Sequence, residues 1–324
     1  MNKKMKVLIG YDGSGCADAA LDDLQRAGLT REAEAVVLSV TEVWLPPPPP
    51  SSYEIVEAAQ AAESPYELQQ IYESGTPAME EARSLAVRVA KRLRNNFPEW
   101  SVRAEASCGS PARELIRNAD EWSPDLIVVG SHGRTALGRF VMGSVSQKVL
   151  TESRSSVRIA RGRVEVDDSP VRIVIGVDGS PGAEAAARAV AARPWPSGSE
   201  ARVIIVDDPF MPTAIGHIIL PVARWVEESN NADRAWVQKI IAPAIEQLRA
   251  SKLIVSIDIK EGDPKRVLVE EAERWGADCI FVGSSGFSNR FERFLLGSVS
   301  AAVAARAHCS VEVVRIAREG EESS

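Results

Sequence analysis

The sequence reads VLIGYDGS at residues 7–14 and IVIGVDGS at residues 173–180. In each stretch an apolar run is followed by Asp-Gly-Ser, the pattern of a buried strand that runs into a turn. Asp12 recurs as Asp178, so the two stretches lie 166 positions apart. Self-similarity at a fixed spacing is the signature of an internal repeat. The chain is therefore predicted to be a head-to-tail duplication of one domain.

Two later segments also recur, at a shorter spacing of 153 positions. They are GSP at 109–111, which returns as GDP at 262–264, and DLIVVGS at 125–131, which returns as DCIFVGS at 278–284. The first copy thus carries 13 extra residues upstream of these segments. Five consecutive prolines at 46–50 mark their place, because such a run joins neither a helix nor a central strand. We interpret this run as a stiff surface spacer, with a ligand for a proline-recognising partner as the alternative.

The repeat defines the domain organisation that we predict. Copy one occupies residues 1–162, with the proline-rich insertion near 44–56, and copy two occupies residues 171–317. The polar stretch 161–170 is the expected linker between them. Residues 318–324 are expected to form a disordered tail.

Short apolar runs alternate with amphipathic stretches in both copies. The runs are rich in Val, Ile and Leu at successive positions, which is typical of strands buried on both faces of a parallel sheet. They lie at 6–11, 35–40, 126–129, 203–206, 254–259 and 279–282. In residues 79–96, apolar side chains recur at helical spacings. This alternation predicts an α/β fold with two doubly wound, Rossmann-like parallel sheets of five strands, one in each copy.

Composition and charge exclude several classes of partner. With 38 Lys and Arg against 45 Asp and Glu, the net charge of −7 gives no positive field for nucleic acid or for an anionic membrane surface. No apolar run is long enough to span a bilayer, and the basic start of the chain is followed by too short an apolar run for a signal peptide. The four cysteines lack CxxC spacing, so we expect reduced thiols in a cytoplasmic protein.

Candidate ligand-binding residues follow the first and fourth strands of each copy. In a doubly wound sheet, ligands bind at the carboxyl ends of the strands, where the winding direction reverses. In copy one these positions are Asp12-Gly13-Ser14 and the segment 130–133, which reads GSHG. Asp12 and Ser14 have an alternative role, because a carboxylate and a hydroxyl at these places also shape a turn and cap the next helix. His132 is interpreted as a solvated loop residue, because the sequence shows no acid or nucleophile beside it; the alternative is that it contacts a phosphate or acts as a base.

The glycines of the second segment favour phosphate binding. Gly130 and Gly133 allow a close backbone approach, and GSVS at 143–146 begins a predicted helix. A helix start presents unpaired N–H groups and the positive end of the helix dipole, which suit phosphate oxygens. The same arrangement follows a buried strand in both copies, which strengthens the interpretation.

Both copies resemble universal stress protein domains, and the whole chain resembles the tandem members of that family, whose fold is like that of the adenine nucleotide alpha hydrolases. Nucleotide-binding members carry the signature G-x2-G-x9-G-[S/T], and copy one matches it from Gly130 and Gly133 to Gly143 and Ser144. The resemblance implies ATP, ADP or AMP as ligand, with Mg²⁺ accompanying the phosphates. The copy-one residues it assigns are Asp12, Val40, Val129, Gly130, Gly133, Gly143, Ser144 and Val145. The copy-two residues are Asp178, Val206, Val282, Gly283, Gly286, Gly297, Ser298 and Val299.

Copy two departs from the signature in one respect. Ten residues, 287–296, separate Gly286 from Gly297, where the signature has nine. The insertion lies in the loop that would span the phosphates. Either the extra residue bulges outward without effect, or it misaligns the phosphate donors. Copy two is therefore still expected to bind nucleotide, with an occupancy below that of copy one.

The last strand of each copy alternates apolar and polar residues, as an edge strand with one wet face does. These segments are VRIAR at 157–161 and VEVVR at 311–315. In the family that the chain resembles, terminal strands pair across a twofold axis. We therefore expect the copies to pack as a pseudo-twofold pair through these strands, with Arg158 close to Glu312; the alternative is two separately exposed edges. Further dimerisation of the chain is compatible with this arrangement.

The leading functional hypothesis is a non-enzymatic stress-response regulator that binds adenine nucleotide and acts on an unidentified protein partner. A second hypothesis is slow ATP hydrolysis at copy one, although the sequence lacks a Walker-type GxxxxGK[ST] motif. A third is a nucleotide-free scaffold for protein partners, against which the complete signature in copy one argues.

Overall fold

The computed structural model describes residues 4–42, 65–132, 142–161, 169–207, 242, 245–284 and 296–316, with side chains of the helix that begins at residue 65 described from residue 77. The proline run at 46–50, positions 162–168 of the predicted linker, and the tail at 318–324 lie outside these residues. Gly133 and Gly286 also lie outside them.

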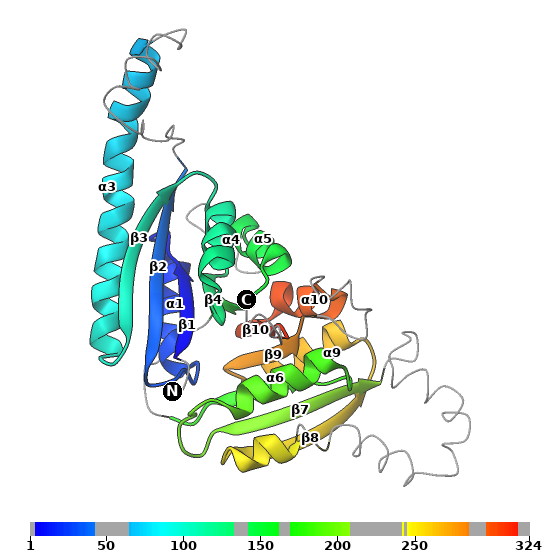
Figure 1. Ribbon diagram of the computed structural model, residues 1–324. Helices are drawn as coiled ribbons and strands as arrows, with labels where there is room; N and C mark the ends of the chain where they lie inside the picture. The colour runs from blue at the N-terminus through cyan, green and yellow to red at the C-terminus, as the bar shows by residue number, and fades with distance from the viewer. Residues whose placement is uncertain are drawn as a thin grey trace, which may run out of the picture.

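Each copy alternates strands and helices in the predicted order (Figure 1). The copy-one elements are β1 (Met5–Gly10), α1 (Gly15–Asp23), η1 (Leu24–Arg26), β2 (Ala33–Thr41), α3 (Pro65–Asn96), β3 (Ser101–Cys108), α4 (Pro111–Trp122), β4 (Leu126–Gly130), α5 (Ser144–Glu152) and β5 (Ser156–Ala160). The copy-two elements are β6 (Arg172–Gly176), α6 (Pro181–Ala191), β7 (Glu200–Asp207), β8 (Ile254–Glu261), α9 (Pro264–Trp275), β9 (Cys279–Gly283), α10 (Ser298–Arg306) and β10 (Ser310–Val314). Residues 245–250 are also helical.

The two copies share one sheet, which differs from the prediction of two separate five-stranded sheets. The sheet has ten strands in the order β3-β2-β1-β4-β5-β10-β9-β6-β7-β8. Within each copy the strands are parallel and follow the same winding. At the centre β5 pairs with β10 in antiparallel orientation, with Arg158 directly opposite Glu312. The expected pairing of the terminal strands is therefore confirmed. It joins the two sheets into one, because the free backbone N–H and C=O groups at the edge of each strand find partners on the other strand.

The alternating pattern of these strands does not mark a solvent-exposed face, so the prediction of a wet face is wrong. Arg158 and Glu312 are each only 1% exposed. The guanidinium of Arg158 contacts the carboxylates of Asp23 and Glu312, with closest distances of 2.5 and 3.3 Å. A buried charge is tolerated when it is paired and hydrogen-bonded. The polar positions of these central strands are thus filled by ion pairs that the sequence pattern alone cannot distinguish from solvated charges.

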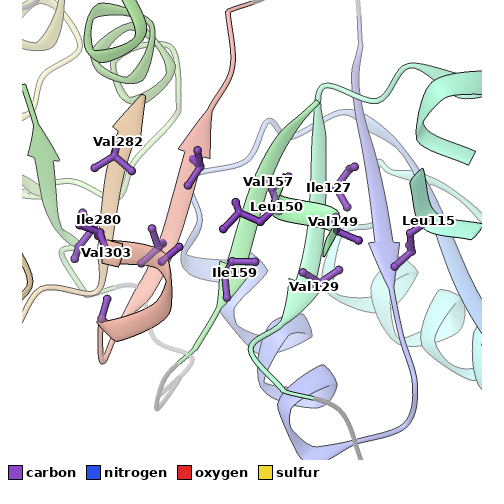
Figure 2. Close-up of a cluster of buried hydrophobic side chains, with 14 of the residues drawn as sticks. Leu115, Ile127, Val129, Val149, Leu150, Val157, Ile159, Ile280, Val282 and Val303 are labelled. Carbon is purple, nitrogen blue, oxygen red and sulfur yellow. The ribbon is translucent and has the colours of Figure 1, made fainter. Parts of the chain in front are cut away.

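The hydrophobic cores lie on the two faces of the sheet. One face carries a single core that runs through both copies, built from the strands together with α4, α5, α9 and α10. Figure 2 shows this cluster extending from Leu115 and Ile127 to Ile280 and Val303. The opposite face carries two separate cores, one under α1 and α3 and one under α6. The continuous core means that the two copies are joined by apolar packing as well as by backbone pairing.

Candidate functional site

The Asp-Gly-Ser turn of copy one lies at the carboxyl end of β1, beside the end of β4. The two strands pair in parallel, so their carboxyl ends meet at one edge of the sheet. An Asp12 carboxylate oxygen accepts a hydrogen bond from the Ser14 amide at 3.0 Å, and the Ser14 hydroxyl accepts one from the Ala17 amide at 3.1 Å. Gly13 has a φ of 78°, a conformation that favours glycine. Both polar side chains therefore shape the turn and start α1, as the alternative interpretation states.

The start of α5 is fastened to the end of β4. The Ser146 hydroxyl donates to the Gly130 carbonyl at 2.7 Å, and the Gly143 amide donates to the Ser131 carbonyl at 2.8 Å. Gly143 is the N-cap residue, and no side chain of the described residues caps this helix. The amides of the first helical turn lack intrahelical acceptors in any α-helix. The N-terminal end of α5, where these amides and the positive end of the helix dipole lie, is therefore held beside the end of β4.

These segments surround a cavity of about 630 Å³. Seven of the eight predicted copy-one residues line it, the eighth being Gly133, which is not described. The seven are Asp12, Val40, Val129, Gly130, Gly143, Ser144 and Val145. Pockets for small molecules and cofactors commonly occupy about 300–1,000 Å³. The cavity therefore has the size for a nucleotide and brings the predicted residues together.

Gly130 is required by packing inside the protein. A Cβ at this position would lie 2.8 Å from the backbone carbon and oxygen of Cys16, at the start of α1. Gly283 repeats the arrangement in copy two, where a Cβ would lie 2.3 Å from the backbone carbon of Gly182. Close approach of helix and strand thus accounts for a glycine that the sequence suggested was there for a ligand.

His132 is buried, so its interpretation as a solvated loop residue is wrong. Only 9% of the residue is exposed, and its Nδ1 lies 3.0 Å from the Ser131 hydroxyl. Its Nε2 is buried without a hydrogen-bond partner in the described part of the chain. Desolvation, with a contribution from the positive charge of Arg161, lowers the pKa of His132 below 6.5. The imidazole that lines the cavity is therefore neutral at physiological pH.

The structure adds lining residues that sequence reasoning missed. They lie on β1 and β2 or directly after these strands, and on α3 and α4, and they include Tyr11, Glu42, Ala78, Glu81, Leu85 and Pro111. The Tyr11 hydroxyl donates to Asp18 at 2.9 Å, and burial together with this bond raises the pKa of Tyr11 to about 12. The helical periodicity of 79–96 indicated which face of α3 is apolar, but no sequence signal placed residues 78–85 of that helix beside the cavity.

Copy two repeats the described part of this geometry. Asp178 accepts from the Ser180 amide at 3.0 Å, and Gly179 has a φ of 75°. The Gly297 amide donates to the Ser284 carbonyl at 2.5 Å, and Gly297 is the N-cap residue of α10, which Ser298 and Val299 begin. Val206 lies near the end of β7, and Val282 and Gly283 end β9. The loop with the extra residue falls on 285–295, outside the described residues.

Comparison with known proteins identifies the family. The model of the universal stress protein family matches residues 4–161 and again residues 171–315. The chain belongs to the universal stress protein family. It contains two universal stress protein repeats, whose limits follow the duplication seen in the sequence.

Relatives of this universal stress protein include a full-length match. A universal stress protein of Mycolicibacterium smegmatis is 28% identical over 316 residues, which cover 95% of this chain and 96% of the relative. A universal stress protein of Mycobacterium tuberculosis is 32% identical over 163 residues, covering 48% of this chain and 45% of the relative. The crystal structure of a universal stress protein from Archaeoglobus fulgidus superposes with a TM-score of 0.60 at 21% identity, covering 96% of this chain and 98% of that one. This last similarity supports the fold.

The helices of the described residues were also compared with the requirements of a membrane span. None of them combines the length and the apolar character needed to cross a bilayer.

Proposed function

We propose that this universal stress protein binds ATP or a related adenine nucleotide in the copy-one cavity and acts as a stress-response regulator. The observation that carries the proposal is the convergence of the described signature residues, Gly130, Gly143 and Ser144, on one cavity of about 630 Å³. The apolar side chains of Val40 and Val129 offer a surface for the base, and the start of α5 offers amides for the phosphates.

Charge on the cavity wall bears on how the phosphates are held. The described lining includes the carboxylates of Asp12, Glu42 and Glu81 and no Lys or Arg. Carboxylates repel phosphates, so the favourable partners in the described residues are the α5 amides and the Ser144 hydroxyl, since the Ser146 hydroxyl already donates to the Gly130 carbonyl. A Mg²⁺ ion bound to the phosphates would reduce this repulsion, with the Ser144 hydroxyl as a neighbouring oxygen ligand. Affinity is therefore expected to be higher for the Mg²⁺ complex than for the free nucleotide.

Regulation requires that nucleotide binds one conformation of the protein better than another. The element best placed for this is α5, which begins in the cavity and contributes Val149 and Leu150 to the core that both copies share. The proposal is therefore a non-catalytic one: occupancy changes the surface around α5 that a protein partner contacts.

The test is a Gly143→Asp variant. Gly143 has φ −66° and ψ 154°, which any residue adopts, and aspartate is a favoured N-cap residue. The new carboxylate should stabilise α5 by only a few tenths of a kcal/mol relative to glycine, yet occupy the first-turn amides and repel phosphate. We expect nucleotide binding at copy one to fall by at least about tenfold, consistent with loss of one charge-assisted hydrogen bond.

Gly297→Asp is the matched control, because Gly297 caps α10 in copy two with nearly the same backbone angles. Calorimetric titration with MgATP, MgADP and AMP would be performed on both variants, after mass spectrometry of small molecules released from the purified protein. Retention of full affinity in Gly143→Asp, or failure of every nucleotide to bind or to raise the melting temperature of the unmodified chain, would refute the proposal.

A further inference from the structure

The junction of β5 with β10 lies on the pseudo-twofold axis of the duplication. Past the one-residue insertion, equivalent positions lie 154 apart, so that Ser144 corresponds to Ser298 and Arg158 to Glu312. Arg158 and Glu312 are also register partners across the junction. A position that pairs with its own equivalent must lie on the axis. A pair of identical domains would have two like charges at this position. In this chain the two copies instead have opposite charges there, Arg158 and Glu312.

Four charged side chains form a buried chain across this point. Asp23 of α1 accepts from Arg158 at 2.5 and 2.9 Å, and Arg158 donates to Glu312 at 3.3 Å. Glu312 in turn accepts from Arg193 at 2.9 Å, and all four side chains are at most 7% exposed. The order across the junction is negative, positive, negative, positive. Burial alone would lower the pKa of Arg158, but the neighbouring carboxylates of Asp23 and Glu312 raise it.

The outer members of the chain also differ between the copies. Positions in the first helix of each copy correspond at an offset of 166, so Asp23 matches Ala189 and Arg193 matches Ala27. The backbone supports this register, because the Ala27 amide donates to the Leu24 carbonyl and the Arg193 amide to the equivalent Val190 carbonyl, both at 3.3 Å. From its outer end to the axis, copy one therefore supplies a carboxylate (Asp23) and then a guanidinium (Arg158). Copy two supplies a guanidinium (Arg193) at its outer end and a carboxylate (Glu312) at the axis.

Two further contacts require one copy of each kind. The Arg193 guanidinium donates to the Ala27 carbonyl at 2.9 Å, across the junction. The Trp195 ring covers Gly28 so closely that a Cβ there would lie 2.8 Å from it. The residue equivalent to Gly28 in copy two is Pro194. Its side chain would occupy the space that Gly28 leaves for the Trp195 ring.

We propose that these residues make the two terminal edges mutually selective, so that the β5 edge accepts a β10 edge and rejects a second β5, and β10 likewise rejects β10. A pair of copy-one domains would place Arg158 against Arg158 in a buried setting, and a pair of copy-two domains would place Glu312 against Glu312. Like charges opposed in an interface are strongly unfavourable. The partner of each edge is thus the other copy, from the same chain or from a second chain.

The experiment measures which pairs the two separated domains form when each can associate either with its own kind or with the other copy. A protease site replaces residues 162–168, the full chain is folded and then cut, and the halves are separated in urea, returned to buffer and counted by native mass spectrometry. We expect mixed pairs to exceed like pairs by about a hundredfold or more. The E312Q variant removes the repulsion between copy-two domains, so pairs of that half should appear. The E261Q variant, the same change at an exposed position of β8, should behave as the unmodified chain does.

Exchange of amide hydrogens in the uncut chain gives a reading that does not depend on refolding of the halves. The E312R variant repeats the charge of copy one on the axis, whereas E312M removes the charge. Exchange of the Ile159 and Val313 amides is expected to be at least about tenfold faster in E312R than in E312M. Equal exchange in these two variants, or like pairs of unmodified halves in the proportion of random association, would overturn the proposal.

Discussion

Replacement of Arg158 by methionine tests how much the buried ion pairs contribute to stability. Arg158→Met keeps much of the aliphatic volume of the side chain and removes the guanidinium. Asp23 then retains the Ser310 hydroxyl at 2.6 Å, and Glu312 retains Arg193. Removal of one partner from a buried ion pair typically costs about 3–5 kcal/mol, because the other charge stays buried. We expect a loss in this range, with most of it from Asp23, whose remaining contact is a neutral hydroxyl.

The control is Arg154→Met, the same change at a pair that is exposed. Arg154 lies 3.9 Å from Asp120, with side chains that are 60% and 47% exposed. Exposed pairs contribute about 0–1 kcal/mol. Urea unfolding can be followed by tryptophan fluorescence, for which the chain has seven tryptophans. If the two variants lose the same free energy of unfolding, or if Arg158→Met loses less than about 1 kcal/mol, the assignment of stability to this network is wrong.

Two further predictions concern the candidate site and its scaffold. His132 should titrate with a pKa below 6.5 in an NMR pH series, whereas a pKa at or above 6.5 would contradict its burial. Because the pKa is lower in the folded than in the unfolded protein, the contribution of His132 to stability is full above pH 6.5 and is lost as the pH falls through the folded pKa. The variant His132→Gln should remove that pH dependence. Gly130→Ala should destabilise the protein by about 1–3 kcal/mol, because its Cβ meets the backbone of Cys16. At Gly15 a Cβ would meet no described atom within 4 Å beyond its chain neighbours and the backbone of its own helix, so Gly15→Ala should stabilise the protein by about 0.4–1 kcal/mol. Equal shifts in the melting temperature would show that the close approach of α1 to β4 is not restrictive.

The sequence predicted the parts of the fold that depend on local pattern. Apolar runs such as 126–129 gave strands because both faces of a parallel sheet are buried, and Asp-Gly-Ser gave a turn because Gly13 must adopt a positive φ. It also placed Asp12 and Gly130 at one edge, since the carboxyl ends of parallel strands meet there, and it placed the helix start at Gly143 beside them. These inferences need only neighbouring residues and the rules of the α/β class, whereas Val40, Val129 and Val145 were assigned by the resemblance to the family.

The remaining features depend on contacts between distant segments. The alternation at Arg158 and Glu312 is the same for a wet strand and for one whose charges are paired inside the protein, so burial could not be deduced from it. Gly130 looks the same whether a ligand or the backbone of Cys16 approaches it. The burial of His132 likewise depends on tertiary packing around the end of β4, to which its neighbours in the sequence gave no guide.

The antiparallel junction determines how the two candidate sites are related. Strands are parallel within each copy but antiparallel between β5 and β10, so the carboxyl ends of the copy-one strands and of the copy-two strands point to opposite edges of the sheet. A single small ligand therefore cannot bridge the sites. What the sites share is the core on one face, because α5 and α10 each begin at a site and both pack into that cluster. Among the described residues, coupling between the sites is therefore expected to pass through this core and the charged junction beside it, rather than through a common ligand.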